Sequence, residues 1–184
     1  EAWAGTPMSE ASEFAAAGGG SGLEFIYSMP GSVGGAVWMN ARCYGHSVCE
    51  VLRRVQYLRP DGRVEWLEVE AAAGGESPEG PWGYKRSPFQ SRPWVILKAV
   101  FALAPGDPQA MQGEMRRVRE DRERKGHFQH PSAGSVFKNN RDFGAPTGQI
   151  IDALGLKGRS VGAARVSALH GNIIVNTGGA TAGE

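Results

Sequence analysis

The stretch RVQYLRPDGRVEWLEV, residues 54–69, decides the first part of the fold. It sets two runs rich in β-branched and aromatic residues, 54–58 and 64–69, on either side of a Pro-Asp-Gly sequence. Side chains of these kinds favour strands, and Pro-Asp-Gly favours a tight turn. The stretch therefore predicts a β-hairpin.

Further elements can be predicted on both sides of this hairpin. After it, the β-branched and aromatic run at 94–103 is typical of a strand. Before it, we expect a short helix at 10–17, with Thr6 or Ser9 as its N-cap and a glycine run ending it. The segment 29–40 begins as a loop, and its second half opens another short helix.

The second half of the chain differs in composition from the first. Residues 109–125 are strongly basic and have high helix propensity. A short helix is predicted at 149–154 and a buried strand at 171–176. Strands and helices do not alternate regularly, so the order predicts an α+β fold. We expect two domains, 1–105 and 106–184.

Composition narrows the classes of function. The chain is 41% hydrophobic and 21% charged, as globular proteins are, and its net charge of +1 gives no general attraction to nucleic acid or a membrane. No apolar run approaches the roughly 20 residues of a membrane span. The histidines and cysteines lack metal-site spacing, so no metal is expected, and we expect reduced thiols in a cytoplasmic protein.

The loop PGSVGG at 30–35 precedes one of the expected short helices. A glycine-rich turn of this kind exposes backbone N–H groups and lets a phosphate approach closely. The loop has neither the Gly-Lys-Ser/Thr of a Walker loop nor the GxGxxG of a Rossmann fold. On pattern alone, a tight structural turn is the better interpretation.

The segment PSAGSVFKN, residues 131–139, concentrates hydroxyl, ammonium and amide groups in a turn followed by a strand. Ser135 could be a nucleophile, but no GxSxG sequence or His/Asp partnership supports that role. It could instead be a positioned proton donor, or a turn serine bonded to nearby backbone. Residue chemistry alone slightly favours the turn serine.

Two further segments gather positive charge. Arg122, Arg124 and Lys125 lie just before the serine segment and suit either a solvated helix face or an anionic ligand. The sequence GYKRSPF at 83–89 combines an aromatic ring, two cations and a hydroxyl. It could contact a carboxylate or phosphate, or be an ordinary loop.

Taken in order, these segments resemble the MurB family of UDP-N-acetylenolpyruvoylglucosamine reductases. Residues 22–45 resemble its flavin-binding stretch, and 84–89 its Tyr-Arg-x-Ser-x-Phe motif. Residues 131–138 resemble its catalytic-serine motif closely, and the motifs within 155–178 follow in family order. The resemblance covers essentially the whole chain.

The resemblance implies part of a FAD-binding domain of the PCMH/vanillyl-alcohol-oxidase type at 1–105, followed by a truncated MurB C-terminal α/β substrate domain at 106–184. NADPH would reduce the flavin, and flavin N5 would deliver hydride to the enolpyruvyl group of a UDP-sugar. The product would be UDP-N-acetylmuramate, a peptidoglycan precursor. A small UDP-sugar is then the partner, with no nucleic acid, membrane or protein partner indicated.

The same resemblance implies roles for particular residues. Ser135 would protonate the substrate, and Lys85 would act with it near the developing enolate or carboxylate. FAD contacts are implied for Gly31, Ser32, Val33, Gly34, Gly35 and Asn40. Substrate contacts are implied for Tyr84, Arg122, Lys125 and Asn139. We expect the Ser135 hydroxyl and the glycine turn to converge on one reacting carbon.

Some features depart from the family pattern. Lys85 stands where the family has arginine, so it keeps the charge but loses the bidentate fork. Only the short stretch 90–93 separates Phe89 from Trp94, which indicates the compact subtype without an extra substrate loop. The family's Gly-x-Gly-Ser-Asn and Leu-Glu-Pro-Glu segments are expected beyond the two ends of this sequence.

Two other functions remain open at this point. A different flavin oxidoreductase, such as a hydroxy-acid or alcohol oxidase, would also suit the glycine loop, although such enzymes need no proton donor at 131–138. A module that only binds a UDP-sugar is the third possibility, and in that case we expect residues 1–184 to bind FAD poorly.

Overall fold

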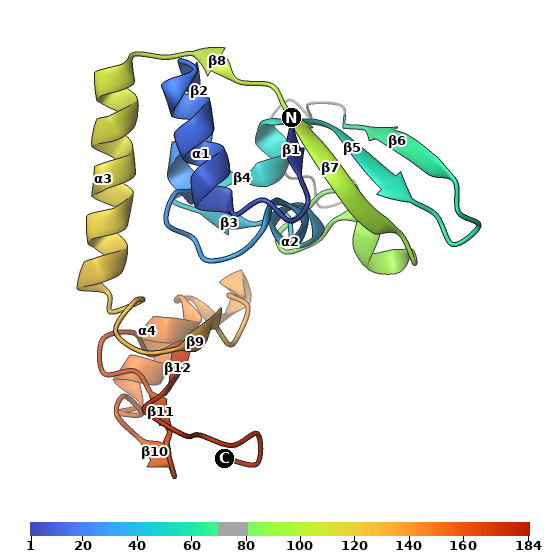
Figure 1. The fold of residues 1–184 in the computed structure, drawn as a ribbon. Coiled ribbons are helices and arrows are strands. Elements are labelled where there is room, and N and C mark those ends of the chain that lie inside the picture. Colours follow the sequence, from blue (N-terminus) through green and yellow to red (C-terminus); the bar gives the residue numbers. More distant parts are fainter. Residues whose placement is uncertain (70–80) are drawn as a thin grey trace. The chain divides into compact units, whose positions relative to one another are not determined.

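The computed structural model describes residues 1–69 and 81–184 (Figure 1). The chain separates into two compact units, Glu1–Arg119 and Glu120–Glu184, and each is described by itself. The division falls within helix α3 (Pro108–Arg124). The assignment of residues 1–105 to a cofactor domain and 106–184 to a substrate domain stays a prediction.

A four-stranded antiparallel sheet organises the first unit, in the order β1-β7-β5-β6. Its strands are β1 (Ala2–Trp3), β7 (Val95–Phe101), β5 (Leu52–Leu58) and β6 (Val64–Glu68). The pairing of β5 with β6 confirms the predicted hairpin, and β7 confirms the predicted strand after it. Val55 and Ala99 lie opposite each other on β5 and β7, are fully buried, and belong to the hydrophobic core.

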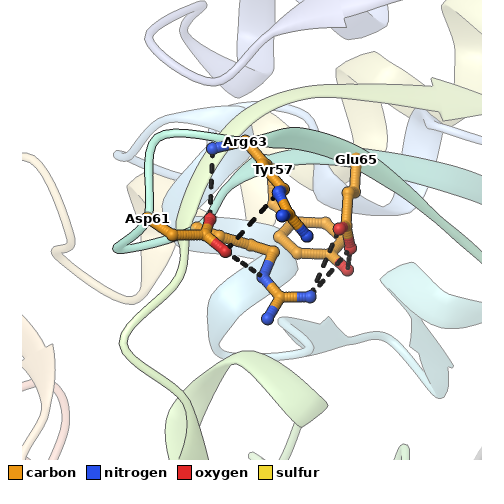
Figure 2. A network of polar contacts seen from close by, with 5 residues as sticks. Tyr57, Asp61, Arg63 and Glu65 are labelled. Atoms are coloured by element: carbon orange, nitrogen blue, oxygen red, sulfur yellow. Dashed lines mark hydrogen bonds and ion pairs between the residues drawn. The ribbon is translucent and has the colours of Figure 1, made fainter.

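Polar side chains hold the turn end of the hairpin together (Figure 2). The phenol of Tyr57 donates to the carboxylate of Glu65 at 2.8 Å, and Arg59 Nη1 lies 3.2 Å from the same carboxylate. Asp61 accepts the backbone N–H of Arg63 at 3.2 Å, as turn aspartates commonly do. Burial, and then the hydrogen bond to Glu65, raise the pKa of Tyr57. The charged neighbours of the predicted turn therefore fix it.

Helix α1 (Met8–Ala17) confirms the first predicted helix, but its predicted caps, Thr6 and Ser9, are wrong. Pro7 is the N-cap residue, and no side chain caps the helix. The N–H of Met8 donates instead to the carbonyl of Gly31 at 3.0 Å. The backbone of the glycine loop thus satisfies a helix donor that a side-chain cap would otherwise satisfy.

The other elements of the first unit are short. They are helix α2 (Val33–Trp38), the 3-10 helices Glu24–Ile26, Val48–Glu50 and Pro88–Ser91, and the strand pairs β2 (Gly20–Ser21) with β8 (Ala104–Pro105) and β3 (Arg42–Cys43) with β4 (His46–Ser47). Helix α2 confirms the short helix predicted in the second half of 29–40. Its Val33 and Val37 are fully buried, so α2 packs into the same core as the sheet.

The second unit contains a smaller antiparallel sheet in the order β10-β11-β12-β9. Its elements are β9 (Ser132–Ser135), the 3-10 helix Arg141–Phe143, helix α4 (Thr147–Ala153), β10 (Ser160–Val161), β11 (Ala164–Val166) and β12 (Ile173–Asn176). Helices α3 and α4 and strand β12 confirm three predicted elements. Antiparallel sheets with helices packed beside them confirm the predicted α+β class.

A membrane-crossing helix would need length and apolar character together, and no helix within 1–69 or 81–184 has both.

Candidate functional site

The glycine loop is anchored to the first residues of the chain. The N–H of Val33 donates to the carbonyl of Thr6 at 2.9 Å, and the N–H of Gly34 to the carbonyl of Ala4 at 2.8 Å. A Cβ atom at Gly34 would lie 2.9 Å from the Cβ of Ala4, closer than real side chains pack. Gly34 is therefore needed for the close approach of the loop to Ala4.

The beginning of the loop has a more open side. Gly31 has a φ of +141°, a conformation that favours glycine, and a Cβ atom there would meet no described atom within 4 Å. The hydroxyl of Ser32 accepts the N–H of Gly35 at 3.2 Å and caps α2. An anionic group can therefore approach the loop closely on the side of Gly31.

Asn40 follows α2 and is fully buried. Its Nδ2 donates to the carbonyl of Gly83 at 2.9 Å, and its Oδ1 accepts the N–H of Cys49 at 3.0 Å. Its φ of +41° lies in the left-handed region, which asparagine enters more readily than most residues. Asn40 thus joins the end of α2 to the start of the Tyr-Lys-Arg-Ser segment.

Side chains also tie residues 83–90 to the end of α2. The hydroxyl of Ser87 donates to the carbonyl of Trp38 at 2.7 Å. Gln90 Nε2 donates to the same carbonyl at 2.9 Å and to the carbonyl of Lys85 at 3.0 Å. Since Ser87 and Gln90 converge on one acceptor, the segment has a defined place beside α2.

Tyr84 and Lys85 form the tip of this segment. The backbones of Gly83 and Arg86 exchange hydrogen bonds of 3.1 and 3.0 Å around them, which closes a tight turn. Lys85 has a φ of +56°, a left-handed conformation that costs a residue with a side chain about 1–2 kcal/mol. Its Nζ lies 6.0 Å from the ring centroid of Tyr84. The turn therefore keeps a cation and an exposed phenol next to each other.

In the second unit, Ser135 is the last residue of β9, and its side chain is exposed. Ile173 on β12 lies opposite it. The next residue, Val136, donates its N–H to the carbonyl of Asn172 at 2.9 Å. The buried side chain of Asn172 then brackets Phe137, accepting its N–H at 3.0 Å and donating to its carbonyl at 2.8 Å. The chain that follows Ser135 is thus fixed by one residue.

Asn139 lies further along the same segment. Its Oδ1 accepts the N–H of Thr147 at 3.0 Å, and the hydroxyl of Thr147 donates to the carbonyl of Lys138 at 3.1 Å. These bonds connect the serine segment to the start of α4. Asn139 therefore has a structural role, and its contact with a substrate stays a prediction.

Arg122 and Lys125, at the end of α3, adjoin two histidines. Arg122 is only 7% exposed, and Lys125 Nζ lies 2.5 Å from the carboxylate of Asp121. The rings of His127 and His170 meet edge to face with centroids 5.8 Å apart. Burial and then Arg122 lower the pKa of His127, and burial and then Lys125 lower that of His170. Arg122 and Lys125 add to the effect of burial on these pKa values, so cations lie near both histidines.

Within the first unit, the structure ties the turn of Tyr84 and Lys85 to Asn40 and the end of α2, the helix that begins in the glycine loop. Within the second it ties the serine segment to Asn172 and α4. Sequence reasoning missed three positioning side chains: Ser87, Gln90 and Asn172. A single amide in the otherwise apolar run at 172–175 was the only signal that could have indicated the last of these.

Comparisons with known proteins find similarity to one family. Residues 126–184 match a family described as UDP-N-acetylenolpyruvoylglucosamine reductase, C-terminal domain. The protein of that name from Borrelia garinii is 42% identical over 164 residues, which is 89% of this chain and 51% of the relative. That of Treponema pallidum is 41% identical over 214 residues, which is 98% of this chain and 60% of the relative.

A solved structure extends the comparison to the fold. The crystal structure of UDP-N-acetylenolpyruvylglucosamine reductase (MurB) from Thermus caldophilus matches 97% of this chain and 63% of that chain, with a TM-score of 0.79 and 33% identity. The chain spans about half to three fifths of the length of the curated relatives described above.

Proposed function

Because the chain belongs to the UDP-N-acetylenolpyruvoylglucosamine reductase family, we propose that it carries catalytic residues of a flavoprotein oxidoreductase. The reaction is the reduction of UDP-N-acetylglucosamine enolpyruvate to UDP-N-acetylmuramate, with NADPH as the reductant and FAD as the carrier. The product is a precursor of peptidoglycan, and the protein acts in the cytoplasm.

The observation that carries this proposal is the fixed place of Ser135. Reduction of a carbon–carbon double bond adds a hydride to one carbon and a proton to its neighbour. A serine hydroxyl can give that proton only when it is aligned with the carbon and water is kept away. Ser135 ends a paired strand, and Asn172 clamps the residues after it, so the backbone that carries the hydroxyl is held, which supports the role of proton donor.

FAD, when bound, supplies the hydride transfer between NADPH and the enolpyruvyl group. The residues that would hold it are Gly31, Ser32, Val33, Gly34 and Gly35. The open side at Gly31 supports this assignment, since backbone can approach a pyrophosphate there. Val33 and Gly34 contribute by anchoring the loop, because their N–H groups are bonded within the chain. Asn40, whose buried amide is bonded to Gly83 and Cys49, would contact FAD from the end of the helix that follows this loop.

Lys85 and Tyr84 would meet the enolpyruvyl end of the substrate. The ammonium of Lys85 would stabilise negative charge that develops on the enolate or carboxylate during reduction. The strained turn around it supports this role, because unfavourable backbone conformations persist where the surroundings hold a functional side chain in place. Lysine acts here as a point charge, without the bidentate fork of arginine.

Arg122 and Lys125 would receive the diphosphate of the UDP group. Phosphate oxygens accept strong charge-assisted hydrogen bonds from both side chains. Lys125 is paired with Asp121, so the diphosphate would compete with that carboxylate for it. Asn139, beyond Ser135 on the same segment, would contact the sugar part of the substrate.

Absorbance assays test the activity in the natural full-length polypeptide that carries these residues. The purified protein should be yellow and should oxidise NADPH only when the enolpyruvyl UDP-sugar is present. A flavin oxidase would instead consume oxygen with a hydroxy acid and ignore the UDP-sugar, and that result would reject the reductase.

A further inference from the structure

The contacts around Asn172 support an inference that rests on the proposed function. Asn172 is 4% exposed and lies immediately before Ile173, the β12 residue opposite Ser135. We propose that Asn172 is a positioning residue, which sets the place of the Ser135 hydroxyl by clamping Val136 and Phe137 after it.

Three hydrogen bonds make up the clamp. The carbonyl of Asn172 accepts the N–H of Val136 at 2.9 Å, its Oδ1 accepts the N–H of Phe137 at 3.0 Å, and its Nδ2 donates to the carbonyl of Phe137 at 2.8 Å. Two successive residues are therefore bonded to a single amino acid. The side-chain amide takes both bonds that a paired strand would give to Phe137.

Backbone pairing between β9 and β12 does not by itself hold the chain after Ser135 in place. The register between β9 and β12 shifts between Ile173 and Val175, so pairing next to Ser135 is irregular. Shifts of this kind re-aim side chains and interrupt ladder bonds. The side chains of Val136 and Phe137 are 49% and 59% exposed, so apolar packing does not immobilise them either. The polar clamp therefore restrains Val136 and Phe137, the two residues after Ser135.

Asn172 is itself held in place. Its backbone N–H donates to Nδ1 of His170 at 3.2 Å, which requires that ring nitrogen to be unprotonated. Two charged groups act on His170, the ammonium groups of Lys125 and Lys157. Each of them favours the neutral imidazole, and so preserves the bond to Asn172.

Stopped-flow measurement of the two half-reactions tests the proposal in the full-length holoenzyme. Asn172→Ala should slow reoxidation of reduced flavin by the enolpyruvyl UDP-sugar about 10- to 100-fold, as displacements of about 1 Å do. Reduction of the flavin by NADPH should change less than about twofold, since no proton passes to the substrate in that step. Asn176→Ala is the matched control, because Asn176 ends the same strand and its Oδ1 accepts the N–H groups of Gly178 and Ala180.

The outcomes separate this inference from the proposed function. Slow reoxidation in Asn172→Ala and normal reoxidation in Asn176→Ala support the positioning role. Equal reoxidation rates in the two variants overturn it and leave the reductase intact. If the wild type itself fails to reoxidise with the UDP-sugar, the proposed function is wrong and the positioning role falls with it.

A second variant covers the case in which Asn172→Ala does not fold. In Asn172→Asp, a protonated carboxyl can still donate to the carbonyl of Phe137, whereas a carboxylate cannot. The reoxidation rate relative to wild type should therefore rise several-fold as the pH is lowered. A ratio that stays flat between about pH 5 and 8 would contradict the clamp.

Discussion

At the scale of single residues, the lack of a side chain at Gly34 lets the glycine loop pack closely against Ala4. Gly34→Ala would place a Cβ atom 2.9 Å from Ala4 Cβ and 3.2 Å from its carbonyl oxygen. Neither atom can retreat easily, because the N–H of Gly34 is bonded to that carbonyl. We expect the free energy of unfolding, measured with urea, to fall by about 1–3 kcal/mol, as in other overpacked sites.

Gly35→Ala is the matched control for this substitution. Gly35 lies next to Gly34 in α2, and its added Cβ would meet Ser32 Oγ at an ordinary 3.5 Å. Alanine also favours a helix over glycine by up to about 1 kcal/mol. Gly35→Ala should therefore be neutral or stabilising, and an equal loss in both variants would show that close packing against Ala4 is not the cause.

Substitutions of Lys85 test whether a positive charge at this position is sufficient for catalysis. Lys85→Met should lower kcat/KM for the enolpyruvyl UDP-sugar by more than about 100-fold, because a positioned charge contributes roughly 3 kcal/mol to such transition states. Lys85→Arg should keep most of the activity, and flavin reduction by NADPH should be unchanged in both. Full activity in Lys85→Met would remove Lys85 from the catalytic residues.

At the scale of elements, local patterns predicted the hairpin, α3 and β7 well. The residue types in these segments favour a strand or a helix without contacts to distant residues. The N-terminus of α1 could not be predicted in this way. Its first donor is satisfied by the carbonyl of Gly31, which lies 23 positions away from Met8 (31 − 8). Capping rules consider only neighbours in sequence, so they pointed to Thr6 and Ser9 instead.

The end of α3 and the turn before β12 also carry a pH dependence. The pKa values of His127 and His170 are lowered in the folded state, by burial first and then by nearby cations. As the pH falls below about 6.5, the unfolded chain therefore binds protons before the folded one does. Stability should be full above that pH and decline as the pH falls through the lowered pKa values.

Unfolding followed by far-UV circular dichroism at several pH values measures this decline in the free energy of unfolding. Replacing His127 and His170 together by glutamine should flatten the dependence below about pH 6.5. His130→Gln is the control, since His130 is exposed and three residues from His127. A slope that survives the double substitution would assign the effect to other groups.

At the scale of the whole molecule, the order of motifs indicated the family. The hydrogen bonds that hold the site together could not be predicted from that order. Asn40 reaches Gly83 across 43 positions, and Ser87 reaches Trp38 across 49. Asn172 reaches Phe137 across 35. Each bond depends on the fold that brings its partners together, so residue type and spacing alone could not predict them.

Half-reaction kinetics of Ser135→Ala test most directly whether Ser135 is the proton donor. In the full-length holoenzyme, reduction of the flavin by NADPH should stay within about twofold of wild type. Reoxidation by the enolpyruvyl UDP-sugar should slow by at least about 100-fold, the contribution typical of a positioned acid. Ser132→Ala, on the same strand, should leave both rates unchanged. Equal losses in the two half-reactions of Ser135→Ala, or no loss in either, would show that Ser135 is not the proton donor.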